Sequence, residues 1–381
     1  MRPLPQLCSQ RLPRAAMSPP SPDLSPLGAA SAATVSWPDA DREAAFWRWF
    51  TPLAQIQGLD ANSLAPASAD ASFRRYLRVL ASDGSSRIVM DAPPPQEDVH
   101  PFIDVARRIQ AAGLHAPAVL AADETQGFVL LADLGSTLYL QALQGADPAQ
   151  ADRLMRDAVT ALVQFQQRVD SNGLPAYDDA LLRRELALFP EWCVGREFGI
   201  HWTAAQQASW DKLCGLLVAS ALAQPQVAVH RDWMPRNLMV TEPNPGILDF
   251  QDAVLGPVTY DPASLLRDAF LSWQEDQEID WAARWWQQAR AAGLLGEHAM
   301  ASDFGECWRA LEWMGLQRHL KVLGIFCRLK HRDGKAAYAA DLPRFFGYAS
   351  KVALRYRELK PLIALLEPMT GSLTTTAFSM R

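Results

Sequence analysis

Three side chains that could bind a metal ion or accept a proton lie in one short segment of the sequence. Asp232 ends a His-Arg-Asp tripeptide, Asn237 follows five positions later, and Asp249 comes directly before an aromatic residue. Carboxylate and amide oxygens suit Mg²⁺ that is bound jointly with phosphates. A carboxylate can instead accept the proton of an attacking hydroxyl. These residue types at this spacing therefore indicate phosphoryl transfer.

A loop and a β-hairpin must position these side chains. Short apolar runs at 227–229, 238–240 and 247–248 are separated by a turn rich in Pro, Asn and Gly, which is typical of a hairpin. Antiparallel pairing of 238–241 with 246–249 would place Asn237 beside Asp249, with Asp232 nearby on the preceding loop.

The His-Arg-Asp tripeptide alone is weak evidence, because Asp and Asn are also common in turns. The sequence contains a second copy at 331–333, where the residue five positions after the Asp is Tyr338 and no hairpin ending in Asp follows. The prediction therefore depends on the whole block from 230 to 249.

Composition narrows the class of protein. The 381 residues are enough for two domains or one bilobal enzyme, and 49% of them are apolar. The net charge of -6 argues against a nucleic-acid partner. No apolar stretch is long enough to span a bilayer, so no membrane partner is predicted. Five scattered cysteines without metal-ligand spacing predict free thiols and a cytoplasmic protein. The oligomeric state stays unknown.

Composition and periodicity also predict the domain organisation. Residues 1–36 are predicted to be a disordered extension, and 37–134 an N-terminal lobe with a helix from Asp39, a hairpin at 73–80 and 87–91, a helix at 99–112 and strands at 117–121 and 128–132. Residues 135–366 predict a helical C-terminal lobe, and 367–381 a mobile tail. The predicted helices of this lobe are 148–170, 179–190, 204–223, 262–273, 280–293, 302–325 and 341–358. The fold class is α+β with two lobes.

The sequence resembles the aminoglycoside/choline phosphotransferase superfamily. The resemblance rests on 230–240, on the Gly-Ile-Leu-Asp-Phe-Gln-Asp-Ala run at 246–253, and on Tyr260-Asp261. Further blocks, at 70–76, 88–94, 181–192 and 321–335, are similar to bacterial anomeric N-acetylmuramate/N-acetylglucosamine kinases of cell-wall recycling. The likeness covers about residues 40–360.

The resemblance implies a protein-kinase-like fold, ATP and Mg²⁺ as cofactors, and roles for individual residues. Asp232 would be the catalytic base, and Asn237 and Asp249 would hold Mg²⁺. Residues 129–133 would form the hinge that contacts adenine, through Leu131 and Asp133. His230 would brace the loop and Asp252 would act from behind the metal ligands, whereas Asp261, directly before a proline, is expected to cap a helix.

One departure from the kinase pattern concerns the strand lysine that holds the α- and β-phosphates. That position falls near Met90, and no lysine precedes Lys212. An inactive kinase is one interpretation. The other, favoured by the intact 232–249 block, is that arginines and a serine at the phosphate loop replace the lysine. These candidate nucleotide-binding residues are Ser72, Arg74, Arg75 and Arg78.

The acceptor is predicted from charge as well as from resemblance. Residues 302–345 contain eight basic and five acidic residues, which favours an anionic acceptor over a polycationic aminoglycoside. The predicted function is transfer of the γ-phosphate of ATP to the anomeric hydroxyl of N-acetylmuramate/N-acetylglucosamine in peptidoglycan recycling. The alternatives are an aminoglycoside or small amino-alcohol phosphotransferase and a nucleotide-binding regulatory pseudokinase.

Overall fold

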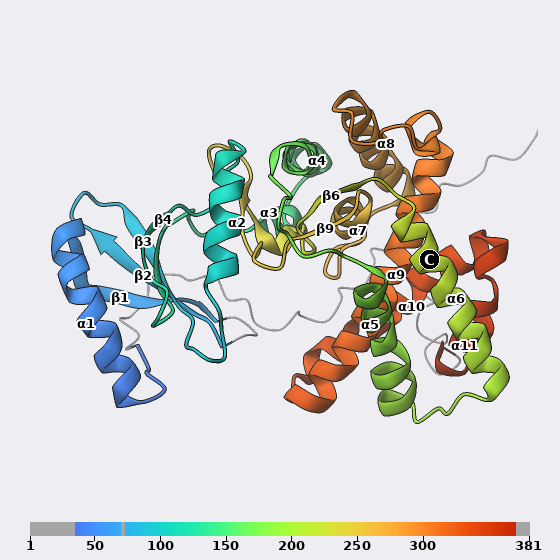
Figure 1. Ribbon diagram of the computed structural model, residues 1–381, viewed down its shortest axis with the longest axis horizontal. Helices are drawn as coiled ribbons and strands as arrows, with labels where there is room; N and C mark the ends of the chain where they lie inside the picture. The colour runs from blue at the N-terminus through green and yellow to red at the C-terminus, as the bar shows by residue number, and fades with distance from the viewer. Residues whose placement is uncertain (1–34, 70–72, 371–381) are drawn as a thin grey trace, which may run out of the picture. The chain divides into compact units, whose positions relative to one another are not determined.

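The computed structural model describes residues 35–69 and 73–370. The described chain begins with a helix and a five-stranded antiparallel sheet and continues as a mainly helical region (Figure 1). This is the predicted α+β, kinase-like arrangement. The predicted extension lies almost entirely outside the described residues, as does most of the predicted tail.

The five strands are ordered β1-β2-β3-β5-β4, and every neighbouring pair is antiparallel. The predicted hairpin at 73–91 is confirmed, and its turn includes Gly84 in the left-handed region, φ 82°. Strand β1 was not predicted, because its sequence contains residues that are rare in strands, such as Asp60 and Pro66. The strands are β1 (Leu59–Ala69), β2 (Arg75–Ala81), β3 (Ser86–Asp91), β4 (Val119–Asp123) and β5 (Phe128–Ala132).

Two helices, α1 (Ala40–Gln57) and α2 (His100–Ala111), cover opposite faces of this sheet (Figure 1). Asp39 caps α1 by accepting the backbone N–H of Arg42 at 2.7 Å. Successive strand residues point to opposite faces. Accordingly, Val89 belongs to the buried cluster around α1, and Met90 belongs to the cluster around α2.

Helices form most of the chain after β5. The longest in the described residues, α9, is capped by Gly334, whose φ of 68° suits glycine. It runs beyond the predicted end at 325, so the second His-Arg-Asp tripeptide forms its last turn. The helices are α3 (Tyr139–Gln144), α4 (Pro148–Arg168), α5 (Asp179–Leu188), a π-helical segment (Phe189–Glu197), α6 (Ala204–Leu222), α7 (Tyr260–Leu266), α8 (Glu275–Ala291), α9 (Phe304–Asp333), α10 (Leu342–Arg355) and α11 (Pro361–Thr370).

Two short antiparallel strand pairs interrupt the helices. Strand β6 (Gln226–Val229) pairs with β9 (Val254–Pro257). Between them, β7 (Leu238–Met239) pairs with β8 (Gly246–Ile247), with Leu238 opposite Ile247. The predicted hairpin is therefore confirmed, although its ladder is shorter than predicted.

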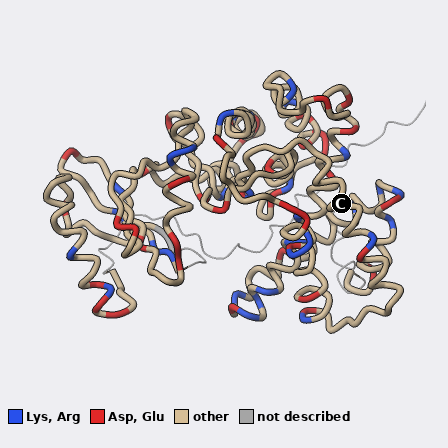
Figure 2. Tube along the Cα trace, viewed as in Figure 1, with Lys and Arg blue, Asp and Glu red and all other residues tan. Residues whose placement is uncertain are grey.

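Charges of both signs are interspersed along the chain (Figure 2). Within the described ranges, no helix combines the length and the apolar character that a membrane crossing requires.

Candidate active site

The β7–β8 hairpin brings the predicted metal ligands together. The side-chain amide of Asn237 donates through Nδ2 to Asp249 Oδ2 at 3.2 Å and to the backbone carbonyl of Asp232 at 2.9 Å. The backbone N–H of Leu248 also donates to the carbonyl of Asn237 at 2.9 Å. One buried amide therefore ties the loop that carries Asp232 to the end of the hairpin that carries Asp249.

Asp249 is held from two sides in a strained backbone conformation. Its φ of 60° lies in the left-handed region, which is uncommon for residues other than glycine. Gln251 Nε2 donates to Asp249 Oδ1 at 2.9 Å. The next residue, Phe250, is fully buried and packs against Phe102 of α2 with ring centroids 4.8 Å apart. These contacts fix the direction of the Asp249 carboxylate.

Three successive backbone N–H groups of residues 230–232, the predicted catalytic loop, are hydrogen-bonded. Asp261 accepts from His230 N at 2.7 Å and from Arg231 N at 3.0 Å, and His230 Nδ1 accepts from Asp232 N at 3.3 Å. Arg318 of α9 donates to the carbonyl of Arg231 at 2.9 Å. The backbone leading to Asp232 is thus determined by two partners from distant parts of the chain.

The expectation that Asp261 caps a helix is wrong. Helix α7 begins one residue earlier, at Tyr260, so Asp261 lies within the helix and its carboxylate turns toward the catalytic loop. The expectation for Asp252 also fails, because this residue is exposed and it is Gln251 that contacts Asp249.

Arg231 is the second described non-glycine residue with a left-handed backbone, φ 75°. Its guanidinium donates to Glu185 Oε1 of α5 at 2.7 Å, and Lys321 of α9 reaches the same oxygen at 2.9 Å. Tyr177 donates its hydroxyl to the other oxygen of Glu185. A strained backbone conformation persists where the surrounding contacts hold it in place. Here Glu185 of α5, Lys321 of α9 and Tyr177 form those contacts around Arg231.

Burial sets the protonation of the groups behind the loop. It lowers the pKa of fully buried His230 to about 4, with a smaller opposing effect from Asp232, so the imidazole is neutral. Burial raises the pKa of Asp261 to about 7, against its two backbone donors and Arg318. Burial would also raise the pKa of Glu185, but Lys321, Arg231 and Tyr177 lower it overall, which keeps Glu185 ionised.

The cationic side of the site comes from α9. Arg318 stacks over the ring of Tyr260 with 4.8 Å between its guanidinium carbon and the ring centroid. Burial would lower the pKa of Lys321, but Tyr260, Glu185 and Asp232 together raise it. The loop carrying Asp232 therefore lies next to permanent positive charge.

The predicted hinge residues differ in their surroundings. Asp133 accepts from Arg78 Nε at 2.6 Å and Ser86 Oγ at 2.6 Å, and it caps the following turn through Gly135 N at 2.9 Å. Leu131 lies inside β5 between β3 and β4, and is buried on the side facing α2. Its backbone pairs with both neighbouring strands. The segment whose backbone groups could contact adenine therefore begins after Leu131.

The predicted phosphate-binding residues are separated by the sheet. Arg75 lies on the face covered by α1, where it pairs with Asp91 and donates to the backbone carbonyl of Ser36. Arg74 pairs with Glu97. Neighbouring positions of a strand face opposite sides, so Arg75 lies on the other face of the sheet from Arg78. Ser72 lies outside the described residues.

The donor set fits a metal ion shared with phosphates. Asn237 uses Nδ2 for both of its hydrogen bonds, and neither bond involves its Oδ1. With Asp249 this gives hard oxygen ligands of the kind that Mg²⁺ prefers. In the described part of the chain, no group of three or more His, Cys, Asp or Glu residues could hold a metal ion.

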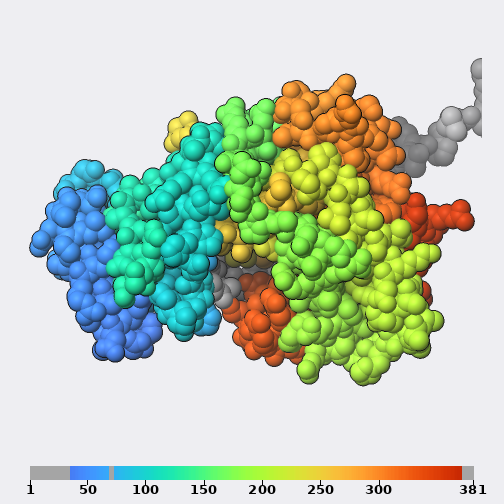
Figure 3. All heavy atoms as spheres, in the orientation of Figure 1, coloured from blue at the N-terminus to red at the C-terminus, as the bar shows by residue number. Residues whose placement is uncertain are grey.

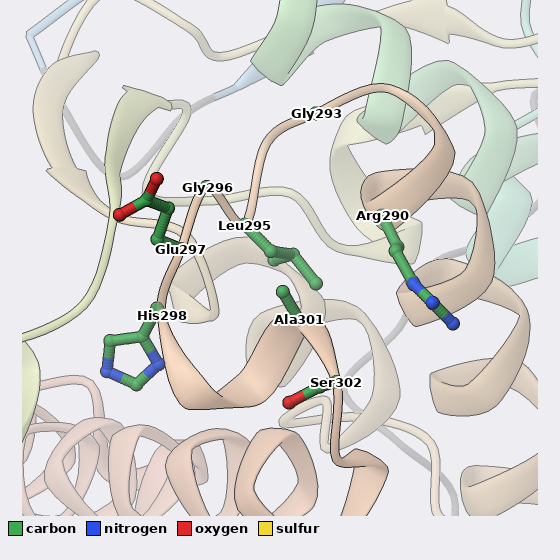
Figure 4. Close-up of a pocket in the computed structure, with 8 residues that line it drawn as sticks. All are labelled: Arg290, Gly293, Leu295, Gly296, Glu297, His298, Ala301 and Ser302. Atoms are coloured by element: carbon green, nitrogen blue, oxygen red, sulfur yellow. The ribbon is translucent and has the colours of Figure 1, made fainter.

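Two cavities lie away from these residues. One of about 390 Å³ opens at the α8–α9 connection, where Arg290 and Glu297 lie on opposite sides (Figure 4). The other, of about 170 Å³, is lined by the hairpin turn at 243–245, by the segment directly after α2 and by α4. Figure 3 shows the cyan surface of α2 beside the green surface of α4. Neither is lined by Asp232, Asn237 or Asp249, so neither is the candidate site.

Comparisons with known proteins agree with this geometry. The model of the family described as "Phosphotransferase enzyme family" matches residues 63–301. An N-acetylmuramate/N-acetylglucosamine kinase of Pseudomonas putida is 51% identical over 306 residues, which cover 80% of this chain and 88% of that protein. A kinase with the same name from Neisseria meningitidis is 47% identical over 306 residues, covering 80% of this chain and 90% of that protein.

Solved structures with the same fold are more distant in sequence. An ethanolamine kinase of Plasmodium vivax aligns with a TM-score of 0.56 and 9% identity, covering 79% of this chain and 86% of that one. An ADP-bound aminoglycoside phosphotransferase aligns with a TM-score of 0.53 and 13% identity, covering 82% of this chain and 99% of that one. At these identities the likeness concerns the fold.

Proposed function

The chain belongs to the phosphotransferase enzyme family, and from this premise we propose that it is an ATP-dependent kinase for the anomeric hydroxyl of N-acetylmuramate and N-acetylglucosamine. Two relatives from Pseudomonas species, each about half identical to this chain over 80% of its length, are named as kinases of these two sugars. Such an activity fits the recycling of peptidoglycan sugars.

The site residues receive their roles from the loop and hairpin. Asp232 orients the sugar hydroxyl and accepts its proton while the oxygen–phosphorus bond forms and ADP departs. Asn237 and Asp249 would hold Mg²⁺, which supplies positive charge to the phosphates when bound. The single observation that supports these roles is that the side-chain amide of Asn237 donates one hydrogen bond to the Asp232 backbone carbonyl and another to the Asp249 carboxylate.

The acceptor side of the proposal is supported by charge. Lys321 and Arg231 converge on Glu185 directly behind the loop of Asp232, and Arg318 bonds to that loop. Glu185 balances part of this charge, but the eight basic against five acidic residues of 302–345 still favour a neutral or anionic sugar over an aminoglycoside polycation.

An ADP-release assay tests the function. We expect turnover with N-acetylglucosamine and N-acetylmuramate, and none with the methyl glycoside of N-acetylglucosamine, whose anomeric oxygen is blocked. The Asp232→Asn variant is the control for contaminating kinases. Turnover of the methyl glycoside would contradict the anomeric position. Turnover of kanamycin alone would favour the aminoglycoside alternative, and ATP binding without any turnover would favour a pseudokinase.

A further inference from the structure

The α2 face of strand β3 carries no cation. Ile88 and Met90 occupy that face, and Met90 is fully buried. The charged residues of the same strand, Arg87 and Asp91, occupy alternate positions, and Asp91 pairs with Arg42 of α1. In protein kinases this strand supplies a lysine that pairs with a helix glutamate and holds the α- and β-phosphates. A different group must supply that charge here.

Strand β2 lies beside β3, and its register identifies which of its arginines share the face of Met90. Tyr76 pairs with Met90, and Arg78 pairs with Ile88. Arg75 pairs with Asp91 and lies against α1, with its guanidinium carbon 4.7 Å from the centroid of Trp37. Alternation therefore assigns residues 74, 76 and 78 to the α2 face and excludes Arg75.

Arg78 is used at the far end of this face. It donates to both oxygens of Asp133 and to the carbonyl of Gly135 at 2.9 Å. This bidentate pair connects β2 to the segment after β5, where the hinge is expected. Arg78 therefore orders the hinge end of the nucleotide site, and its guanidinium is directed away from the phosphate end.

Arg74 lies at the opposite end of the face, in a pair that resembles a lysine–glutamate pair in chemistry. Its Nε donates to Glu97 Oε2 at 2.9 Å, and each of the two side chains is 12% exposed. The second oxygen of Glu97 accepts the backbone N–H of Phe73 at 3.2 Å. Glu97 precedes α2 by three residues. One carboxylate thus fixes both the guanidinium of Arg74 and the backbone beside it.

The same segment connects Arg74 to the proposed metal ligand. Glu97 leads into α2, whose Phe102 packs on Phe250, the neighbour of Asp249. The β2–β3 end of the sheet, the start of α2 and the metal-ligand segment are therefore joined by direct contacts.

We propose that Arg74 is the residue that binds the nucleotide phosphates in place of the strand lysine, and that Glu97 is the positioning residue that orients it. The proposal rests on the proposed function in one respect, that ATP occupies the α2 face of the sheet. A guanidinium carries five N–H donors in a planar fork. The bond through Nε sets the plane of that fork, and the side chain of Tyr76 also hydrogen-bonds to the guanidinium. With its five donors the fork can keep these bonds and still make a charge-assisted contact with a phosphate.

Calorimetric titration with three probes tests the proposal: MgATP, MgADP and adenosine. Arg74→Ala is expected to weaken binding of MgATP and MgADP by about 10- to 100-fold, the loss of a charge-assisted hydrogen bond. Binding of adenosine, which has no phosphate, is expected to be unchanged. Arg74→Lys keeps the charge and is expected to recover part of the loss. Glu97→Gln is expected to weaken MgADP binding less than Arg74→Ala.

Arg87→Ala is the matched control, because Arg87 lies one strand away and its guanidinium bonds to its sequence neighbours, Ser85 Oγ and the Ser86 carbonyl. It is expected to bind all three probes like the wild type. Unchanged MgADP affinity in Arg74→Ala would overturn the proposal, and so would an equal loss for adenosine. The titrations contain no sugar, so their result does not depend on whether the proposed acceptor is correct. A wild-type protein that binds no nucleotide would refute the proposed function itself.

Discussion

The carboxylate of Asp261 accepts the backbone N–H of His230 across 2.7 Å, although the two residues are 31 positions apart. The same carboxylate accepts the N–H of Arg231 at 3.0 Å. A fully buried residue thereby determines the backbone from which the proposed catalytic base projects. This relationship, together with the hairpin, suggests a set of measurements.

Replacing Asp261 by asparagine should loosen the catalytic loop. The amide has one acceptor oxygen in place of two, so one buried N–H of the loop loses its partner. We expect the free energy of unfolding to fall by about 1–3 kcal/mol and kcat to fall, with little change in the KM for ATP. Urea unfolding and steady-state kinetics would measure this. A variant with normal kcat would show that the loop keeps its shape without Asp261.

Replacing Asp232 by asparagine should remove the proton acceptor while preserving the fold. Turnover is expected to fall about 10²- to 10⁴-fold, with an unchanged melting temperature. The chain offers a matched control in Asp333→Asn, the same substitution in the second His-Arg-Asp tripeptide, at the exposed end of α9. Comparable losses in both variants would contradict the assignment of Asp232.

Gln251 should matter for the metal ion more than its neighbour Asp252. Gln251 holds Asp249 Oδ1 at 2.9 Å, and loss of such support typically weakens metal affinity about 10- to 100-fold. We expect Gln251→Ala to need a correspondingly higher Mg²⁺ concentration for half-maximal activity. Asp252→Asn, at an exposed position, should behave like the wild type. If the two variants respond to Mg²⁺ alike, Gln251 does not orient the metal ligand.

Acid should reduce the stability that His230 contributes. Its folded-state pKa of about 4 lies below the ordinary value of 6.5, so its contribution is complete above pH 6.5 and is lost as the pH falls toward 4. At pH 5 the loss is about 2 kcal/mol. His230→Asn keeps an acceptor for the N–H of Asp232 but does not titrate.

The His230→Asn variant should therefore be less stable than the wild type at pH 7.5, and the difference should narrow at pH 5. Urea unfolding at both values measures it. The comparison between variants removes the contribution of Asp261, whose raised pKa acts in the opposite direction and is common to both proteins. A pH-independent difference would mean that His230 is not buried in its neutral form.

The sequence was sufficient to predict the elements that local pattern determines. The 230–249 spacing predicted the hairpin and the meeting of Asn237 with Asp249, because turn chemistry and apolar runs are local properties. Most long helices were predicted near their observed bounds for the same reason. Strand β1 and the pairing of β6 with β9 were not predicted, since their formation depends on neighbouring segments that are distant in sequence.

The residues that support the site were harder to predict than the site itself. Glu185 lies in a basic stretch of α5, and its role appears only when Arg231 and Lys321 converge on it. Asp261 looked like a cap because a proline follows it. Arg75 looked equivalent to Arg74 and Arg78, although alternation in β2 sends it to the other face. These are properties of tertiary packing, and one sequence carries no direct signal for them.

The left-handed backbones at Arg231 and Asp249 limit how far this protein can be made heat-resistant. Non-glycine residues in this region cost about 1–3 kcal/mol each, and glycine relieves the cost. At position 249, however, that change would also remove a carboxylate proposed to bind metal. Selection for thermostability alone would thus favour substitutions at these positions that stabilise the fold but reduce activity. A library screened without a turnover assay should therefore leave residues 231 and 249 unchanged.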